Sequence, residues 1–125
     1  MKRLSFFLSL LLLSGCSAPA GSGSFQRIPQ SEAAELMQSS EDYVILDVRT
    51  PGEYAEGHIE GAVNLPNEEI VDKEIPLLPE KDQLILVYCR SGNRSRQASQ
   101  KLADLGYTNV KEFGGINTWP GTIVK

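Results

Sequence analysis

Short apolar runs alternate with helix-like segments along most of the chain. Three runs rich in β-branched, aromatic or leucine residues occur at residues 43–47, 84–88 and 110–113. Each has the length of a buried strand, and the run at 84–88 is the most apolar one beyond the N-terminal region. We therefore predict three strands at these positions. Residues 59–65 alternate weakly and predict a further short strand.

The first two predicted helices stand on either side of the first strand. Ser31 can cap a short helix that carries alanine, leucine and methionine in its first two turns. Thr50, Pro51 and Glu53 have the spacing of a capping box with a first-turn proline, so a second short helix begins there. Gly57 is predicted to end it.

Residues 67–72 predict a brief helix, which a proline-containing loop follows. Two further helices are predicted beyond residue 88. After the strand at 84–88, a helix with alanine and leucine side chains on one face ends at Gly106. Gly114 and Gly115 are predicted to break the last strand, and a short C-terminal helix that includes Trp119 comes next.

Strands that alternate with helices in this way predict an α/β fold. The sheet is expected to be mainly parallel and covered by helices on both faces. In such folds, ligands bind beyond the carboxyl ends of the strands. The length of 125 residues and an apolar content of 41% fit one small domain plus a tail.

The tail has the pattern of an export signal. Lys2 and Arg3 precede an apolar stretch, which is too short to span a bilayer and is followed by Ser14-Gly15-Cys16. This end resembles the bacterial lipobox, in which the cysteine is lipidated and becomes the new N-terminus. We therefore expect a signal peptide at residues 1–15, a lipid-anchor cysteine and flexible tether at 16–25, and the folded domain at 26–125. Cleavage at the small residues 18–20 is the alternative.

Charge and export restrict the partners that can be expected. The formal net charge is −4, and removal of residues 1–15 would leave 10 basic and 16 acidic side chains. An acidic chain of this kind argues against nucleic acid or an anionic lipid surface as the main partner, because both are bound by neutralising phosphates. We expect the protein to lie in the bacterial cell envelope, outside the cytoplasm. It is expected to contact the membrane only through the lipid on Cys16. We expect a monomer.

Cys89 becomes the only thiol of the domain once Cys16 is lipidated, so no intramolecular disulfide can form. An exported protein that keeps one unpaired cysteine keeps a reactive group in an oxidising compartment. The alternative is a buried, inert cysteine.

The loop after residue 88 decides between these interpretations. Cys89-Arg90-Ser91-Gly92-Asn93-Arg94-Ser95 joins a predicted buried strand to a predicted helix, so the thiol stands at the strand tip and the following amides can converge on it. These amides, the positive end of the helix and the guanidinium groups of Arg90 and Arg94 all favour a thiolate. Gly92 allows the backbone to curl without a side chain inside the loop. Arg96 is expected to face solvent.

Four motifs carry a resemblance to single-domain rhodaneses, which are sulfurtransferases. They are the Cys89–Ser95 loop, Leu46-Asp47-Val48-Arg49 with Glu53-Tyr54, the stretch Gly57-His58-Ile59-Glu60-Gly61-Ala62-Val63-Asn64-Leu65-Pro66, and Gly114-Gly115 through Trp119. The resemblance covers residue 26 to the end. It implies a three-layer rhodanese-like fold and no cofactor.

The resemblance also implies a reaction in two steps through a Cys89 persulfide. The thiolate takes the outer sulfur of a donor such as thiosulfate, and a thiol or cyanide then accepts it. The whole loop is implied to bind the anion, with Arg90 attracting it. For Arg94, pairing with a carboxylate is the equal alternative to contact with substrate.

Two other functions compete with sulfur transfer. The first is a non-catalytic rhodanese-like docking module, which the intact cysteine argues against. The second is a cysteine phosphatase or arsenate reductase. The loop places four residues between Cys89 and Arg94, one fewer than those phosphatases use, and Tyr88 stands where they usually carry histidine.

The remaining candidates are expected to be scaffold. Asp47 and Arg49 could border the pocket, but a salt bridge between loops is the favoured interpretation. His58 is the only histidine, yet an activated thiolate needs no permanent base. One histidine and one thiol do not form a metal site. Trp119 could border the pocket, although we expect it to cover the core.

Overall fold

The protein is described here by a computed structural model that covers residues 23–71 and 74–125. Its centre is a sheet of five strands in the order β1-β6-β5-β2-β4, and all neighbouring strands are parallel. The strands are β1 (Gln26–Arg27), β2 (Tyr43–Asp47), β4 (Val63–Asn64), β5 (Leu84–Cys89) and β6 (Val110–Gly115). The fold is therefore α/β with a parallel central sheet, as the sequence predicted.

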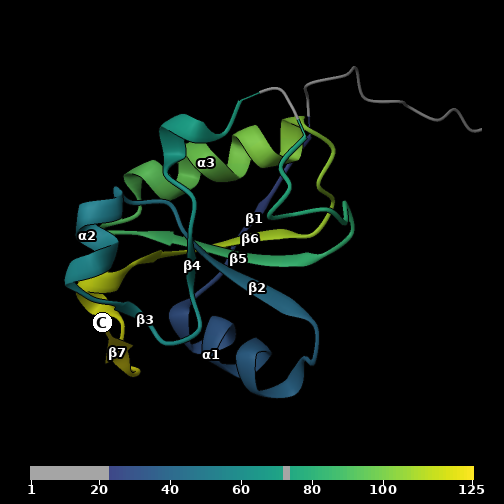
Figure 1. The fold of residues 1–125 in the computed structure, drawn as a ribbon. Helices are drawn as coiled ribbons and strands as arrows, with labels where there is room; N and C mark the ends of the chain where they lie inside the picture. Colours follow the sequence, from purple (N-terminus) through teal and green to yellow (C-terminus); the bar gives the residue numbers. More distant parts are fainter. Residues whose placement is uncertain (1–22, 72–73) are drawn as a thin grey trace, which may run out of the picture.

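Helices cover both faces of this sheet (Figure 1). The helices are α1 (Gln30–Ser39), α2 (Pro51–Glu56), α3 (Asn93–Asp104) and the short 3₁₀ helices η1 (Asn67–Glu69) and η2 (Ile116–Thr118). Helix α3 lies on one face and α1 on the other. A second, two-stranded antiparallel sheet pairs β3 (His58–Ile59) with β7 (Ile123–Val124).

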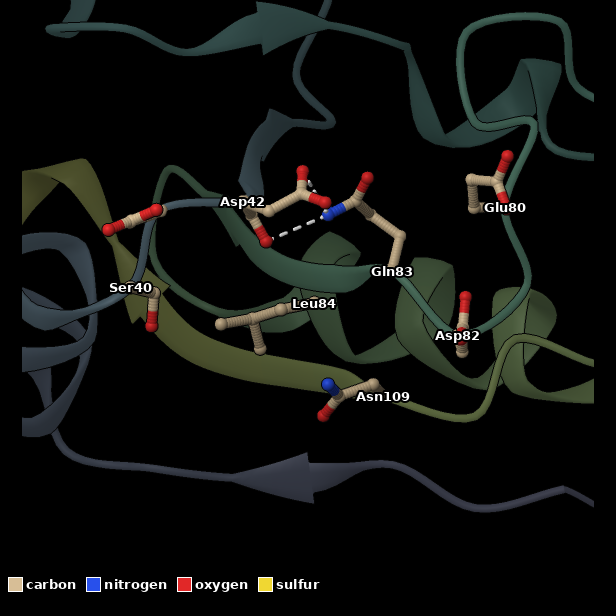
Figure 2. A pocket seen from close by; sticks show the side chains of 8 residues that line it. Ser40, Asp42, Glu80, Asp82, Gln83, Leu84 and Asn109 are labelled. Carbon is tan, nitrogen blue, oxygen red and sulfur yellow. Dashed lines mark hydrogen bonds between the residues drawn. The ribbon is translucent and has the colours of Figure 1, made fainter.

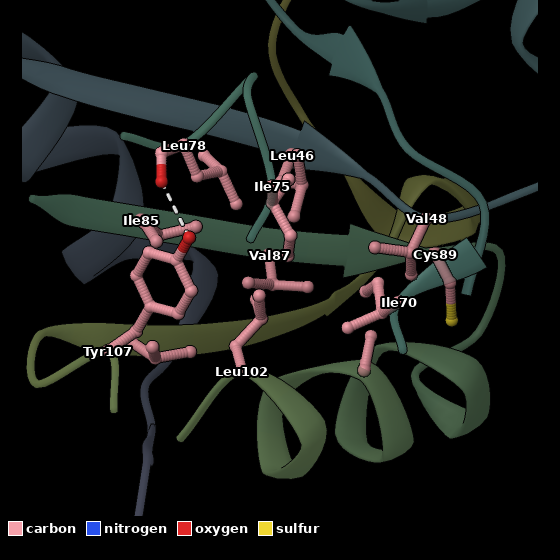
Figure 3. Close-up of a cluster of buried hydrophobic side chains, with 12 residues drawn as sticks. Leu46, Val48, Ile70, Ile75, Leu78, Ile85, Val87, Cys89, Leu102 and Tyr107 are labelled. Carbon is pink, nitrogen blue, oxygen red and sulfur yellow. Dashed lines mark hydrogen bonds between the residues drawn. The ribbon is translucent and has the colours of Figure 1, made fainter. Parts of the chain in front are cut away.

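The alternation of side chains along β5 divides the core into two parts. Ile85, Val87 and Cys89 belong to the cluster beneath α3, together with Leu102 (Figure 3). Leu86 and Tyr88 belong to the cluster on the α1 face, with Ala33 and Phe113. Because successive strand residues point to opposite faces, the odd-numbered register of β5 turns the Cys89 side chain toward α3.

Four local predictions were wrong. Helix α1 begins at Gln30 after Pro29, so Ser31 is its second residue and not its cap. Gly114 and Gly115 do not break the last strand, because β6 continues through Gly115. Residues 59–65 do not form one strand: β3 ends at Ile59, β4 covers only Val63–Asn64, and the two belong to different sheets. The C-terminal helix η2 ends at Thr118, so it does not include Trp119. Strands β1 and β7 were not predicted.

Several N-terminal predictions lie outside the described residues. They are the signal peptide at 1–15, the lipidated Cys16 and most of the tether, and they stay predictions. Among residues 23–71 and 74–125, no helix has the length and apolarity required to cross a bilayer.

A buried polar network lies where β2 ends. Arg49 donates to Asp47 through Nη2 at 2.7 Å and to the Gly57 carbonyl at 2.7 Å, and Asp47 is fully buried. The Tyr88 hydroxyl donates to Asp47 Oδ2 at 2.6 Å and accepts from the Ile59 amide at 3.0 Å. This network joins β2, β5 and β3, so it fixes the chain next to the end of β5.

A second contact ties α2 to the start of α3. Thr50 and Glu53 form the predicted capping box. Glu53 also accepts two hydrogen bonds from Arg94, at 2.7 and 3.1 Å. The Arg94 guanidinium is the strongest influence on Glu53 and, with Thr50, lowers the pKa of its carboxyl to about 2, although partial burial opposes this shift.

Replacing Tyr88 by phenylalanine should destabilise the fold. The change removes one donor from buried Asp47 and the acceptor of the Ile59 amide, at an expected cost of about 2 kcal/mol in the free energy of unfolding. Urea denaturation measures it. Tyr43→Phe is the matched control, because its half-buried hydroxyl donates only to the Met37 carbonyl. Equal losses in the two variants would contradict the role of this network.

Replacing Glu53 by glutamine should remove a pH-dependent part of the stability. The folded pKa of Glu53, about 2, lies below its ordinary value of 4.5. Its stabilisation is therefore fully present above pH 4.5 and disappears as the pH falls through about 2. We expect Glu53→Gln to lose about 1 kcal/mol at pH 7, since both partners are partly exposed, and to approach the parent protein near pH 2. Glu56→Gln, at an exposed position of α2, should show no such convergence.

Candidate active site

The chain reverses between β5 and α3 within a short loop. Cys89 is the last residue of β5, and α3 begins at Asn93. Gly92 has φ = 110°, a left-handed conformation that residues with a side chain rarely adopt. Gly115 of β6 packs against the outside of the loop, where a Cβ would lie only 2.0 Å from the Arg90 carbonyl oxygen. The paired glycines of the last strand thus permit β6 to approach the loop.

The loop directs hydrogen-bond donors at the Cys89 sulfur. The Gly92 amide donates to Sγ at 3.0 Å, and Ser95 Oγ lies 3.4 Å from Sγ. Burial alone would raise the pKa of this thiol. The Ser95 hydroxyl and the amides of Ser95, Gly92 and Ser91 together lower the pKa below its ordinary value.

Cys89 is buried, with 1% of its surface exposed. Burial is typical of an inert structural cysteine, but converging donors are typical of a reactive one. Figure 3 shows the sulfur at the end of β5, directed toward the first turn of α3. The positive end of that helix adds to the field that favours a thiolate.

The other loop residues divide into a rim and a base. Arg90, Ser91 and Asn93 are exposed, whereas Gly92 and Ser95 are buried. The Arg90 backbone is fixed because its carbonyl accepts from the Asn117 amide at 3.2 Å. Its side chain therefore extends from an anchored position at the rim.

Arg94 lies between the loop and α2. Its pKa is raised, chiefly by the hydrogen bond to Glu53, and the Cys89 charge also contributes. The guanidinium therefore pairs with the Glu53 carboxylate and also interacts electrostatically with Cys89. The structure thus shows Arg94 paired with a carboxylate, and its contact with substrate stays a prediction. Arg96 is exposed on the first turns of α3.

Asp47, Arg49, His58 and Trp119 belong to the scaffold around the site. Asp47 and Arg49 form the buried ion pair already described. The His58 ring stacks on Tyr54 with centroids 3.7 Å apart, and its Nδ1 is 2.9 Å from the Tyr54 carbonyl. The Trp119 ring lies 5.3 Å from the Phe113 ring, against the core on the α1 face.

Sequence reasoning missed a carboxylate beside the thiol. Glu112 of β6 is 2% exposed, and its Oε2 accepts from Ser95 Oγ at 2.6 Å and from the Gly114 amide at 2.9 Å. Its Oε1 is 3.4 Å from Arg27 Nε. Alternation from Val110 turns residue 112 toward the α3 face, so a charged residue in an otherwise buried register was the available signal.

Two of the surface pockets lie at opposite ends of the central strands. A shallow pocket of about 330 Å³ adjoins the loop and is lined in part by Gln30, Ser91, Glu112 and Thr118. A larger one of about 730 Å³ lies at the opposite edge of the sheet, near the amino end of β5 (Figure 2). There Gln83 donates to the Asp42 carbonyl at 2.9 Å. Ligands of parallel sheets bind at the carboxyl ends of strands, which is where the smaller pocket lies. Ser91 of the loop lines this pocket, but Cys89 does not.

No group of three histidine, cysteine, aspartate or glutamate side chains in the described ranges is placed to hold a metal ion.

Known proteins share both the sequence pattern and the fold. The family model of the rhodanese-like domain matches residues 30–121. Thiosulfate sulfurtransferase PspE of Escherichia coli (strain K12) is 38% identical over 71 residues, which are 57% of this chain and 68% of that protein. Thiosulfate sulfurtransferase GlpE of Pseudomonas putida (strain KT2440) is 36% identical over 99 residues, 78% of this chain and 87% of that protein.

A solved structure agrees with these matches. The structure described as rhodanese with anions from E. coli superimposes with a TM-score of 0.61 and 36% identity, covering 66% of this chain and 98% of that one. The parallel sheet, the cysteine at the tip of β5 and the family match over residues 30–121 lead to one conclusion. The chain belongs to the rhodanese-like domain family.

Proposed function

We propose that the protein is a rhodanese-type sulfurtransferase that moves sulfane sulfur from thiosulfate or a related anion through a persulfide on Cys89. The observation that carries this proposal is the set of amides around Sγ, with the Gly92 amide at 3.0 Å. These donors favour the thiolate, and a persulfide is an anion of the same sign. Relatives named thiosulfate sulfurtransferase support the same reaction class.

The first half-reaction loads the enzyme. The Cys89 thiolate attacks the outer sulfur of thiosulfate and forms a new S–S bond. The S–S bond of thiosulfate breaks, and sulfite leaves with its electron pair. The outer sulfur stays on Cys89 as a persulfide, and the amides of the loop stabilise its negative charge.

The second half-reaction removes the outer sulfur from Cys89. Cyanide or a thiolate attacks the outer sulfur, the persulfide bond breaks, and its electron pair returns to Cys89 as the thiolate. One cysteine is enough for this cycle, which agrees with Cys89 as the single cysteine of the described residues. Because Sγ itself is buried, small ligands are expected to reach it more readily than large ones.

The buried thiol and the loop length also bear on the phosphatase alternative. Gly92 and Ser95 occupy the base of the loop, and four residues separate Cys89 from Arg94. Fewer amides are then available around a tetrahedral phosphate than around a single sulfur atom. The sulfur-transfer proposal is favoured on this ground.

Purified protein should produce thiocyanate and sulfite from thiosulfate and cyanide. Cys89→Ser should lose this activity by a factor of about 10³ or more, because serine lacks the nucleophile that carries the second sulfur. Thiosulfate alone should add the mass of one sulfur atom to the Cys89 peptide, measured by mass spectrometry.

Equal turnover in the two proteins would exclude the mechanism. No added sulfur would favour a docking module, and phosphate release from an aryl phosphate would favour a phosphatase.

Replacing Arg90 by alanine should weaken binding of the anionic donor. An exposed charge at the rim contributes about 1 kcal/mol of attraction, so the KM for thiosulfate should rise about fivefold with little change in kcat. Arg96→Ala, which removes an exposed charge one turn away, is the matched control. Identical KM values for the two variants, or a strong preference of the parent protein for mercaptopyruvate, would contradict the role of Arg90.

A further inference from the structure

A buried carboxylate is connected to the nucleophile by one hydroxyl. Glu112 reaches Ser95 Oγ at 2.6 Å, and Ser95 Oγ lies 3.4 Å from Cys89 Sγ. The three side chains come from β6, α3 and β5. All three are buried, at 2%, 0% and 1% exposure. The sulfur-transfer steps above give Glu112 no role.

The Ser95 hydroxyl has one proton, and its direction follows from its neighbours. Three oxygens are within reach: Glu112 Oε2 at 2.6 Å, the Gly92 carbonyl at 3.0 Å and the Gly114 carbonyl at 3.4 Å. The carboxylate is the nearest and accepts the strongest bond because it is charged. While Cys89 is a thiol, the hydroxyl therefore donates to Glu112, which leaves its lone pair to accept the Sγ–H of Cys89. The hydroxyl can donate to Sγ only when the sulfur is a thiolate.

The groups that face this chain of hydrogen bonds come from several neighbouring elements. From β1, Arg27 approaches Oε1 at 3.4 Å, but its side chain is 65% exposed and therefore well screened. From α1, the neutral Gln30 side chain donates to the Phe113 and Gly115 carbonyls. On the Cys89 side, Arg94 of α3 is paired with Glu53 of α2. Glu112 thus has one screened cationic partner and one neutral main-chain donor, the Gly114 amide at 2.9 Å from Oε2.

We propose that Glu112 is a positioning residue that accepts the Cys89 proton through Ser95. The Sγ–H bond breaks and its proton binds Ser95 Oγ, while the original hydroxyl proton binds Glu112 Oε2. No electrons are gained or lost, and one negative charge moves from the carboxylate to the sulfur. This inference rests on the proposed function, in which Cys89 is the nucleophile.

Both protonation forms keep the hydrogen bonds that link the three side chains. Before the transfer, Sγ–H donates to Ser95, which donates to Glu112. Afterwards, Glu112 donates to Ser95, which donates to the thiolate, while the Gly92 amide bonds Sγ in both forms. The transfer therefore requires no movement of a side chain. It also means that an approaching anion meets one negative charge at the site and not two.

A pair that shares one proton has a recognisable pH profile. Its two protons leave in two separate macroscopic steps, and the reactive thiolate is partly populated between them. We expect alkylation of the Cys89 peptide by iodoacetamide, followed on the full chain by mass spectrometry, to show a plateau bounded by two transitions. Glu112→Gln has nearly the same shape but cannot take the proton. It should show one transition, below which the rate falls about tenfold per pH unit.

The controls separate proton sharing from a purely structural role. Glu35→Gln, at an exposed position of α1, should keep both transitions. Ser95→Ala, which removes the connecting hydroxyl, should lose the plateau. A single transition in the parent protein overturns the proposal, even if Glu112→Gln does not fold. An unchanged two-step profile in a folded Glu112→Gln variant, verified by circular dichroism, overturns it as well.

The same samples distinguish this inference from the proposed function. Absence of thiocyanate formation with a two-step alkylation profile would reject sulfur transfer and keep the proton pair. Normal thiocyanate formation with a one-step profile would keep sulfur transfer and reject the role of Glu112.

Discussion

The hydrogen bonds that converge on Cys89 Sγ set the requirements for the rest of the site. The Gly92 amide can reach the sulfur at 3.0 Å only because the chain turns sharply between β5 and α3, and Gly92 takes the left-handed conformation that this turn needs. Strand β6 lies close behind this loop, and the absence of a side chain at Gly115 permits that close approach. A charge placed on sulfur is thus stabilised by backbone that the sheet holds in position.

The sheet also decides which way the thiol faces. In β5, Tyr88 and Cys89 point to opposite faces. Tyr88 enters the α1 side and binds Asp47, which anchors the end of β2, while Cys89 enters the α3 side and meets the start of that helix. A shift of one residue in register would exchange the two side chains. The buried Asp47–Arg49 pair therefore serves the site from the far face by holding this register.

Local sequence signals predicted the parts of the structure that local contacts determine. The strand at residues 84–88, the capping box at Thr50 and the loop after Cys89 all follow from neighbouring residues. The start of α1 was misplaced because Gln30 extends the helix and bonds carbonyls of β6, a contact across 83 to 85 positions of chain. The alternation of β6 could have placed Glu112 in a buried register, but its bond to Ser95 joins residues from different elements and leaves no mark on spacing along the chain.

The protein is acidic, yet it can bind the proposed anionic substrate, because an anion at the site is stabilised by groups close to Sγ and not by the net charge of the chain. The formal charge is −4, yet main-chain amides and the end of α3 act on Sγ at short range, where burial reduces screening. Glu112 adds a negative charge at the same place, which would oppose an incoming anion if it stood beside a thiolate. A proton shared through Ser95 removes that conflict, because the carboxylate becomes neutral as the sulfur becomes charged. The buried carboxylate then helps to form the nucleophile without repelling its substrate.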